Sequence, residues 1–257
     1  MYSVVRIPAF NDNYLWLLKN ELNLAAIVDP GDAKPVLKLL QEQNLELKEI
    51  LLTHHHPDHI GGVQELLEHF PDAKVFGPDT KRFSMVTHPC TQGDEIKLSI
   101  SDMSFTVISV PGHTIDHIAY YSKPNIFVGD TLFSSGCGRL FEGTHKQMLT
   151  SLKQLSELPN NSQVYCAHEY TLANSTFASH VLPNNSAIET FKTSVQLKRE
   201  KNQPTVPTTI AVEKSINPFL LCHTNELQIA IKDKYKLQLQ PSELETFTYL
   251  RKWKDDF

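Results

Sequence analysis

The stretch that decides the fold is Ile50-Leu51-Leu52-Thr53-His54-His55-His56-Pro57-Asp58-His59-Ile60-Gly61-Gly62. It places His54, His56, Asp58 and His59 directly after an apolar run, Ile50–Thr53, that predicts a strand. Alternating side chains at the end of a strand converge on a cavity as the chain turns. The alternative is an accidental histidine-rich surface loop, but the position behind a strand and before two glycines argues against it. The stretch therefore predicts a metal site.

Three more potential ligands follow predicted strands elsewhere in the chain. They are His113 after Phe105–Val110, Asp130 after Ile126–Gly129, and His168 after Gln163–Ala167. A single histidine or aspartate at a strand end is more often a cap or a turn residue. Together with the first loop, however, they supply five histidines and two aspartates, a donor set that suits two divalent ions. Zinc is the first expectation, and iron and manganese are the alternatives.

The rest of the chain surrounds these segments with an α/β pattern. Short apolar runs predict strands at 14–18, 24–28, 50–53, 105–110, 117–121, 126–129 and 163–167. Leucines at helical spacing predict helices at 33–43, 61–70 and 146–158. After Tyr170 the pattern becomes mostly helical, with helices expected at 171–180, 187–202, 225–235 and 242–254. We therefore expect a layered catalytic domain at 1–170 and a small helical domain at 171–257.

Composition narrows the class of protein. The 257 residues are 40% hydrophobic and 21% charged, which is ordinary for a folded globular protein. The net charge of −5 disfavours nucleic acid as a partner. No run of apolar residues is long enough to cross a membrane, and no signal peptide is recognisable. The four scattered cysteines predict neither disulfides nor a cysteine zinc site, so we expect a cytoplasmic protein. We also expect the protein to be a monomer.

The order of these residues resembles the motif series of the metallo-β-lactamase superfamily. The series runs from Asp29 through His54-x-His56-x-Asp58-His59 and His113 to Asp130 and His168. The resemblance implies an αβ/βα sandwich with a dinuclear metal site at one edge. It further implies that each ion has three ligands of its own and that Asp130 bridges the two ions. Asp29 would support the loop of residues 54–59. The implied ligand sets are His54, His56 and His113 for the first ion, and Asp58, His59 and His168 for the second.

A narrower resemblance is carried by six segments, Thr53–Gly62, Gly129–Arg139, Glu142–Thr144, Cys166–Thr171, Asn217-Pro218-Phe219 and Leu250–Phe257. They resemble the hydroxyacylglutathione hydrolase, or glyoxalase II, family. The implied reaction is hydrolysis of S-D-lactoylglutathione to D-lactate and glutathione, the second step of methylglyoxal detoxification. A hydroxide bridging the two metals would attack the thioester, with Asp58 and Asp130 as the catalytic carboxylates.

The same resemblance implies residues that bind the glutathione thioester. They are Arg139, where some relatives have lysine, together with Tyr170, Arg251 and Lys254. Phe141 stands where a tyrosine is frequent, which removes one hydroxyl contact. Considered without the resemblance, Arg251 and Lys254 would be interpreted as a solvated basic helix face.

Other functions remain open from the sequence. A persulfide dioxygenase-like protein shares the histidine loop but uses one iron and typically lacks the helical domain. A β-lactamase or lactonase would direct the same chemistry at another acyl group, and a nuclease of this fold is disfavoured by the charge. A metal-loaded binding module without turnover is the alternative from another class. The remaining histidines, including His55 and His117, have no ligand-like context.

Overall fold

The computed structural model describes residues 2–82 and 84–257. Its contacts divide the chain into two compact units, Met1–Ser109 with Asp116–Gly129, and Val110–Ile115 with Asp130–Phe257. Residues 130–170, expected in the first domain, thus pack within the second unit. The boundary expected at residue 170 follows the sequence pattern and stays a prediction.

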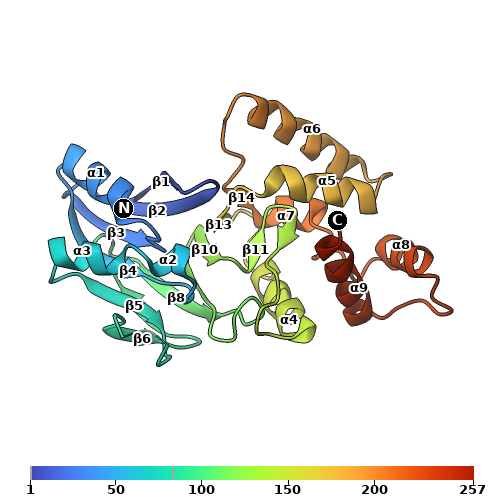
Figure 1. Cartoon of the computed structure of the whole chain (residues 1–257), viewed down its shortest axis with the longest axis horizontal. Coiled ribbons are helices and arrows are strands. Elements are labelled where there is room, and N and C mark those ends of the chain that lie inside the picture. The colour runs from blue at the N-terminus through green and yellow to red at the C-terminus, as the bar shows by residue number, and fades with distance from the viewer. Residues whose placement is uncertain (1, 83) are drawn as a thin grey trace. The chain divides into compact units, whose positions relative to one another are not determined.

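The first unit contains a mixed sheet whose strands follow the order β1-β2-β3-β4-β5-β6 (Figure 1). The strands are β1 (Ser3–Ala9), β2 (Asn13–Lys19), β3 (Leu24–Val28), β4 (Glu46–Leu51), β5 (Lys74–Pro78) and β6 (His88–Cys90). The pairs from β1 to β3 are antiparallel, whereas those from β3 to β6 are parallel. Helices cross over between β3 and β4 and between β4 and β5, the usual connection for parallel neighbours. These helices are α1 (Ala33–Glu42), α2 (Pro57–Ile60) and α3 (Val63–His69).

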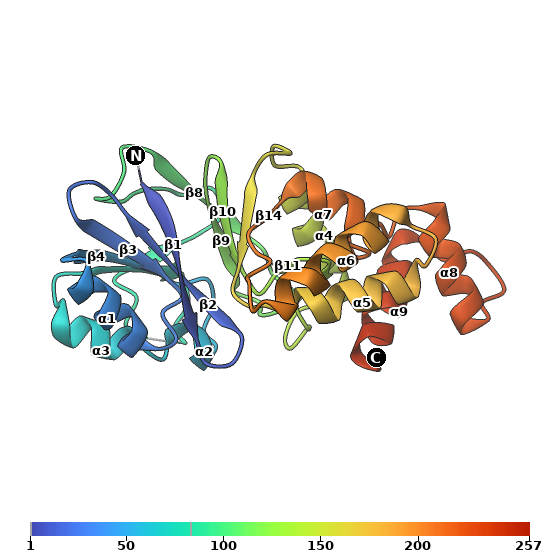
Figure 2. The same ribbon diagram turned by 90° about the horizontal axis from the view of Figure 1, so that it is seen from above.

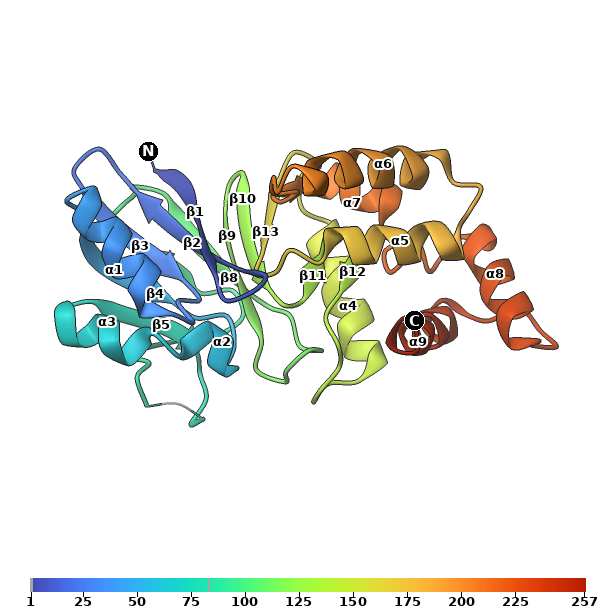
Figure 3. The ribbon, with the colours of Figure 1, turned by 45° about the horizontal axis from the view of Figure 1, so that its top comes forward.

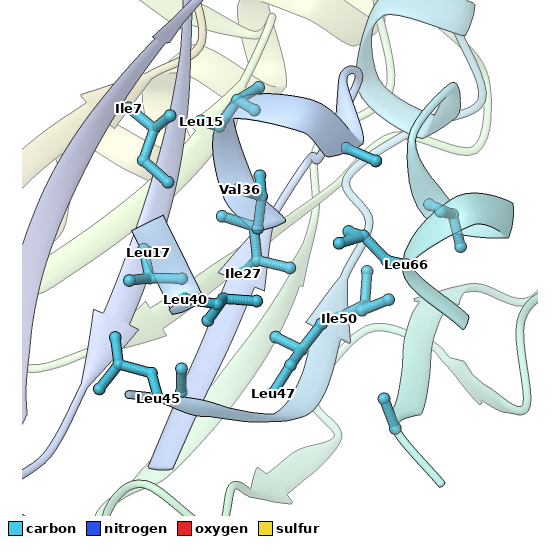
Figure 4. Packing of buried hydrophobic residues seen from close by; sticks show 14 of the residues in the cluster. Ile7, Leu15, Leu17, Ile27, Val36, Leu40, Leu45, Leu47, Ile50 and Leu66 are labelled. Atoms are coloured by element: carbon cyan, nitrogen blue, oxygen red, sulfur yellow. The ribbon is translucent and has the colours of Figure 1, made fainter. Parts of the chain in front are cut away.

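Helices α1 and α3 cover one face of this sheet (Figure 2). Val36 and Leu40 of α1 and Leu66 of α3 meet Ile27 and Ile50 of the central strands in a buried cluster (Figure 4). Burying such side chains stabilises a fold by about 1.5–3 kcal/mol each. The cluster therefore fixes β3 and β4. Asp29 follows the carboxyl end of β3, and the histidine loop, residues 54–59, follows that of β4.

A second group of strands in the first unit is antiparallel, in the order β10-β9-β8-β7. The strands are β7 (Glu95–Lys97), β8 (Ser104–Ser109), β9 (Ile118–Ser122) and β10 (Asn125–Gly129). Tyr120 of β9 is fully buried, and its hydroxyl donates to the carbonyl of Leu52 at 2.8 Å. The amide of Ile118 likewise donates to the carbonyl of Thr53 at 3.0 Å. These bonds tie the second sheet to the segment that leads into the histidine loop.

The second unit combines two short strand pairs with helices (Figure 3). The pairs are β11 (Leu132–Phe133) with β12 (Gly136–Cys137), and β13 (Gln163–Cys166) with β14 (Thr208–Thr209). The helices are α4 (His145–Ser156), α5 (Thr171–Val181), α6 (Ser186–Glu200), α7 (Ile210–Ile216), α8 (Asn225–Tyr235) and α9 (Glu243–Asp255). Helix α5 lies beside α6, and capping boxes at Thr144 and Ser242 begin α4 and α9. No helix in the described part of the chain is both long and apolar enough to span a bilayer.

The predicted elements are all present; the ends of β3 and α8 are as predicted, and those of the others are shifted. The largest shift is in β4, which begins at Glu46 and ends at Leu51, whereas the prediction was 50–53. It ends early because the amide of Thr53 bonds to the Asp29 carboxylate instead of a neighbouring strand. Elements missed from the sequence are mostly too short to show a period. They are β1, β5, β6, β7, β11, β12, β14, α2 and α7.

Candidate metal centre

The histidine loop turns sharply from β4 into α2. Pro57 stands at the first position of α2, where its missing amide hydrogen costs nothing, and Asp58 and His59 follow in the first turn. Glycine is required where the loop after β3 packs against this turn. A Cβ at Gly31 would lie 1.8 Å from the carbonyl oxygen of Asp58, and one at Gly62 would lie 2.6 Å from that of Pro30. This close packing brings Asp29 against the histidine loop.

The loop brings ligand atoms within reach of one another. Nε2 of His54 lies 3.1 Å from Nδ1 of His56, and Nε2 of His59 lies 3.5 Å from Oδ2 of Asp58. The His54 and His59 rings are 4.0 Å apart, and both are buried. Two atoms that each bind one tetrahedral ion at about 2.1 Å lie about 3.4 Å apart. The spacing in the loop therefore fits metal ligands.

Asp29 and Thr53 orient two of these histidines. The Asp29 carboxylate accepts from the amide and the hydroxyl of Thr53, both at 2.7 Å, and lies 3.0 Å from Nδ1 of His59. Because a carboxylate only accepts, Nδ1 of His59 carries the proton and Nε2 presents a lone pair. The Thr53 hydroxyl donates to Asp29, so at 3.1 Å it accepts from Nδ1 of His54. Both histidines thus present Nε2, as a metal requires.

Neighbouring side chains complete the loop's surroundings, and sequence inspection missed two of them. His117 is buried and stacks on His54, with ring centroids 4.6 Å apart. The Asn13 amide donates to Oδ2 of Asp58 at 3.0 Å. His55, by contrast, lies against Asp116 at 3.3 Å, outside the ligand set. Asn13 and His117 belong to no sequence motif, so only their contacts in the folded chain identify them as supporting residues.

The second unit brings its own three predicted ligands together. Oδ2 of Asp130 lies 3.5 Å from Nε2 of His113 and 3.4 Å from Nε2 of His168. Nδ1 of His113 is 2.8 Å from the carbonyl of Arg139, which only accepts, so Nε2 again presents the lone pair. His168 stacks on Tyr170 with centroids 4.7 Å apart. Each unit therefore holds a ligand cluster with the spacing that divalent ions need, and His54, His59 and His113 present Nε2.

A pocket of about 420 Å³ lies within the second unit. It is lined by Arg139, Leu140, Phe141, Gly143, His145, Arg251 and Asp255. The pocket carries two guanidinium groups and one carboxylate, and Nε of Arg139 lies 3.5 Å from Oδ1 of Asp255. Two of the four predicted substrate residues thus line one cavity, where they favour an anionic ligand.

Arg251 does not lie on a solvated helix face. The residue is 4% exposed, and its guanidinium donates to the Cys137 carbonyl at 3.0 Å and to Asp255 at 2.8 Å. Its buried Nε has no hydrogen-bond partner among the described residues. The Lys254 ammonium lies over the ring of Phe177 at 5.1 Å. Burial, together with the positive charges of Arg251 and Arg139, lowers the pKa of Lys254 to about 8.

Comparison with known proteins agrees with this arrangement. Residues 11–168 match the model of the metallo-beta-lactamase superfamily, and residues 169–257 match that of the hydroxyacylglutathione hydrolase C-terminus. A hydroxyacylglutathione hydrolase from Photobacterium profundum is 47% identical over 257 residues, which cover all of both chains. The crystal structure of ETHE1 from Myxococcus xanthus is 26% identical, with a TM-score of 0.66 over 99% of each chain. Another solved structure, determined in a di-iron-bound form, is 25% identical with a TM-score of 0.59, covering 85% of this chain and 100% of that one.

The sandwich of strands and helices with ligands at strand ends defines the class, and the chain is a member of the metallo-β-lactamase superfamily. Within that superfamily it belongs to the hydroxyacylglutathione hydrolase family, because both its halves match this family's relatives along their full length. The predicted fold, an αβ/βα sandwich followed by a helical region, is thereby confirmed.

Proposed function

We propose that the chain hydrolyses S-D-lactoylglutathione to D-lactate and glutathione. The observation that carries the proposal is the pairing of two features in the second unit. A carboxylate lies between two histidines, and a pocket with two arginines lies in the same unit. Relatives named hydroxyacylglutathione hydrolases, 47–48% identical over all 257 residues, support the same activity. Residues 1–170 would carry the chemistry, and residues 171–257 would contribute substrate recognition.

We assign the metal ligands to two ions, following the family resemblance. His54, His56 and His113 would hold one ion, and Asp58, His59 and His168 the other. Asp130 would bridge them, since its Oδ2 lies beside one histidine from each set. The chemistry of the donors suits zinc first and iron or manganese as alternatives. A similar protein crystallised in a di-iron-bound form supports iron as an alternative.

The chain's residues have separate tasks in the reaction. Bound divalent ions would lower the pKa of a coordinated water and polarise the thioester carbonyl. Asp29 and Thr53 keep the protons of His59 and His54 on Nδ1. Asn13 holds one oxygen of Asp58, whose side chain is 40% exposed and can meet solvent or substrate. A thioester releases a thiolate, whose pKa near 8.5 makes a strong general acid unnecessary.

Glutathione carries two carboxylates, and the second unit offers cations for them. We assign its binding to Arg139, Tyr170, Arg251 and Lys254. Arg139 is the most accessible of the cations, with a side chain that is 65% exposed, and it lines the pocket. The Tyr170 ring is 38% exposed and stacks on the ligand His168. Phe141 lines the same pocket and is 64% exposed, so the hydroxyl missing there would reduce the number of polar contacts.

The cellular setting follows from the same chemistry. All four cysteines are free and buried, which favours a reducing compartment, so we propose a cytoplasmic enzyme. The net charge of −5 supports a small anionic substrate held by local cations over nucleic acid. We also propose that the chain is a monomer, because its own sequence supplies all seven expected metal ligands.

The test combines turnover with metal analysis. Purified protein loaded with zinc is mixed with S-D-lactoylglutathione, and the released thiol is measured alongside the metal content of the same sample. The expected result is zinc-dependent thiol release that a chelator abolishes. Protein that holds two ions per chain and releases no thiol would instead be a binding module, and the proposal would be wrong.

A pair of variants tests the substrate assignment. Arg139→Ala should raise KM for the glutathione thioester roughly tenfold, because one charge-assisted contact contributes about 1.5 kcal/mol. The lactoyl thioester of a small uncharged thiol should show no such change. Lys252→Ala, which removes an exposed cation beside Arg251, is the matched control and should leave both values unchanged. A KM shift for both thioesters would contradict carboxylate recognition.

A further inference from the structure

The β11–β12 hairpin joins two residues of the proposed site. Asp130 precedes it with Thr131 between, and Arg139 follows it after Gly138. Its strands pair only through Leu132 with Cys137 and Phe133 with Gly136. A hairpin this small is at best marginally stable by itself. Its turn residue Ser135 has φ 58°, a left-handed conformation that costs a non-glycine residue about 1 kcal/mol or more. The hairpin therefore needs support from outside.

Three helices supply that support through side chains that bond to the hairpin backbone. Asn174 of α5 donates to the Ser134 carbonyl at 3.2 Å, and Arg251 of α9 donates to that of Cys137 at 3.0 Å. Asn217, at the end of α7, donates to the carbonyls of Phe133 at 3.1 Å and Gly136 at 3.0 Å. Thus the Asn217-Pro218-Phe219 motif of the sequence has a definite task in the fold.

Glu213 of α7 is the centre of this support. Its Oε2 accepts from the backbone amide of Ser135 and from the side-chain amide of Asn217, both at 3.0 Å. Its Oε1 accepts from the Thr208 hydroxyl at 2.6 Å. The side chain is fully buried, and burial raises the pKa of its carboxyl group. Burying a carboxylate costs free energy, so stability alone gives no reason to keep one here. Its bond to the amide of Ser135, the strained turn residue, gives such a reason.

The hairpin transmits its position to the ligands by close contact. A Cβ at Gly138 would lie 2.0 Å from the carbonyl oxygen of Asp130 and 3.2 Å from Nδ1 of His113. The Gly138 amide donates to the Thr131 carbonyl at 3.2 Å, and the next carbonyl, that of Arg139, receives the His113 ring proton at 2.8 Å. A shift of the hairpin would therefore move both ligands and Arg139 together.

We propose that Glu213 and Asn217 are positioning residues that hold the hairpin so that Asp130 and His113 meet the metal and Arg139 meets the substrate. The inference rests on the proposed function for the roles of these three residues. It assigns to helix α7 a task in metal affinity, although neither residue is itself a ligand. The helical region would then contribute to the metal centre as well as to recognition.

The test compares Glu213→Ala with Glu213→Gln in the full chain. The alanine variant leaves the Ser135 backbone amide without its acceptor and removes one of the three acceptors near the Asn217 side-chain amide. Glutamine keeps one oxygen for both donors and can donate to the Thr208 hydroxyl. We expect Glu213→Ala to weaken zinc affinity by about tenfold or more, measured against a chromophoric chelator. Hydrogen exchange over residues 131–138 should become faster, KM should rise and kcat should fall. Glu213→Gln should stay within about threefold of the unmodified chain in each value.

Val195→Ala is the matched control. It opens a cavity in α6, at a buried residue outside the hairpin contacts, and should lower stability while leaving zinc affinity and hairpin exchange unchanged. If Glu213→Ala behaves like this control, the residue is merely structural and the proposal is overturned. Should Glu213→Ala fail to fold, Thr208→Val and Asn217→Ser carry the same comparison. A chain without thioesterase activity would defeat the proposed function, while zinc affinity and exchange would still decide the role of Glu213.

Discussion

Replacing Asp29 with asparagine should weaken metal binding without disturbing the fold. The asparagine oxygen can still accept from the Thr53 amide, and its NH2 group can donate to the Thr53 hydroxyl. The same NH2 group would face Nδ1 of His59, which now donates to a carboxylate oxygen at 3.0 Å. Two donors cannot share a hydrogen bond, so His59 would move its proton to Nε2 or turn away. Either change removes the lone pair that the metal needs.

The magnitude follows from the hydrogen bond that is lost. A bond to a charged, buried acceptor contributes about 1.5–3 kcal/mol, which corresponds to roughly 10- to 150-fold in affinity. Loss of such supporting residues typically costs about 10- to 100-fold in metal affinity. We therefore expect Asp29→Asn to retain one ion after dialysis against a chelator that leaves two on the unmodified chain. Mass spectrometry of the folded protein and elemental analysis both count the ions.

Asp32→Asn is the matched control for this experiment. Asp32 caps α1 by accepting from the Lys34 amide at 3.0 Å, and asparagine caps a helix equally well. Equal metal content in the Asp29 and Asp32 variants would refute the tautomer argument. It would mean that Nδ1 of His59 finds another acceptor, or that His59 is no ligand.

Three further predictions address charge, ligation and packing. In the unmodified chain, kcat/KM for the glutathione thioester should fall as the pH rises through about 8. The reason is that Lys254, whose pKa is lowered to about 8, loses its charge there. Lys254→Arg should abolish the fall in a pH series, because arginine stays charged. Asp58→Ala should lose most activity and one ion, whereas His55→Ala should lose little; equal losses would contradict the ligand assignment. Gly129→Ala should destabilise the chain by about 2 kcal/mol more than Gly93→Ala in urea unfolding. Both glycines have positive φ, but a Cβ at Gly129 would lie 2.4 Å from the Thr53 hydroxyl, while nothing lies within 4 Å at Gly93.

Much of the layered fold was predictable because its signals are local. Apolar runs and leucines at helical spacing located the main strands and helices, since each depends on residues close in sequence. Helix α7 escaped because Pro204 and Pro207 suggested only a connection, although the Thr209 hydroxyl accepts from the Val212 amide and begins the helix. Strands β11 and β12 are two residues long and leave no periodic signal.

The candidate ligands were also determined by the sequence alone. Histidine and aspartate directly after apolar strands are a chemical signal that does not depend on distant contacts, as His54 and Asp130 illustrate. The burial of Arg251, by contrast, depends on Cys137, which lies 114 residues away in the chain. A basic residue on an amphipathic helix looks the same in sequence whether water or protein surrounds it.

Tertiary structure decided how the ligands are held. The proton on His59 is fixed by Asp29, 30 residues away, and the β11–β12 turn is fixed by Glu213, 78 residues away. Such bonds form only after distant segments have packed, because their geometry is set by strands and helices that share no local pattern. The sequence therefore determined which residues are candidate metal ligands, and the packing of those segments determined which of their ring nitrogens carry protons.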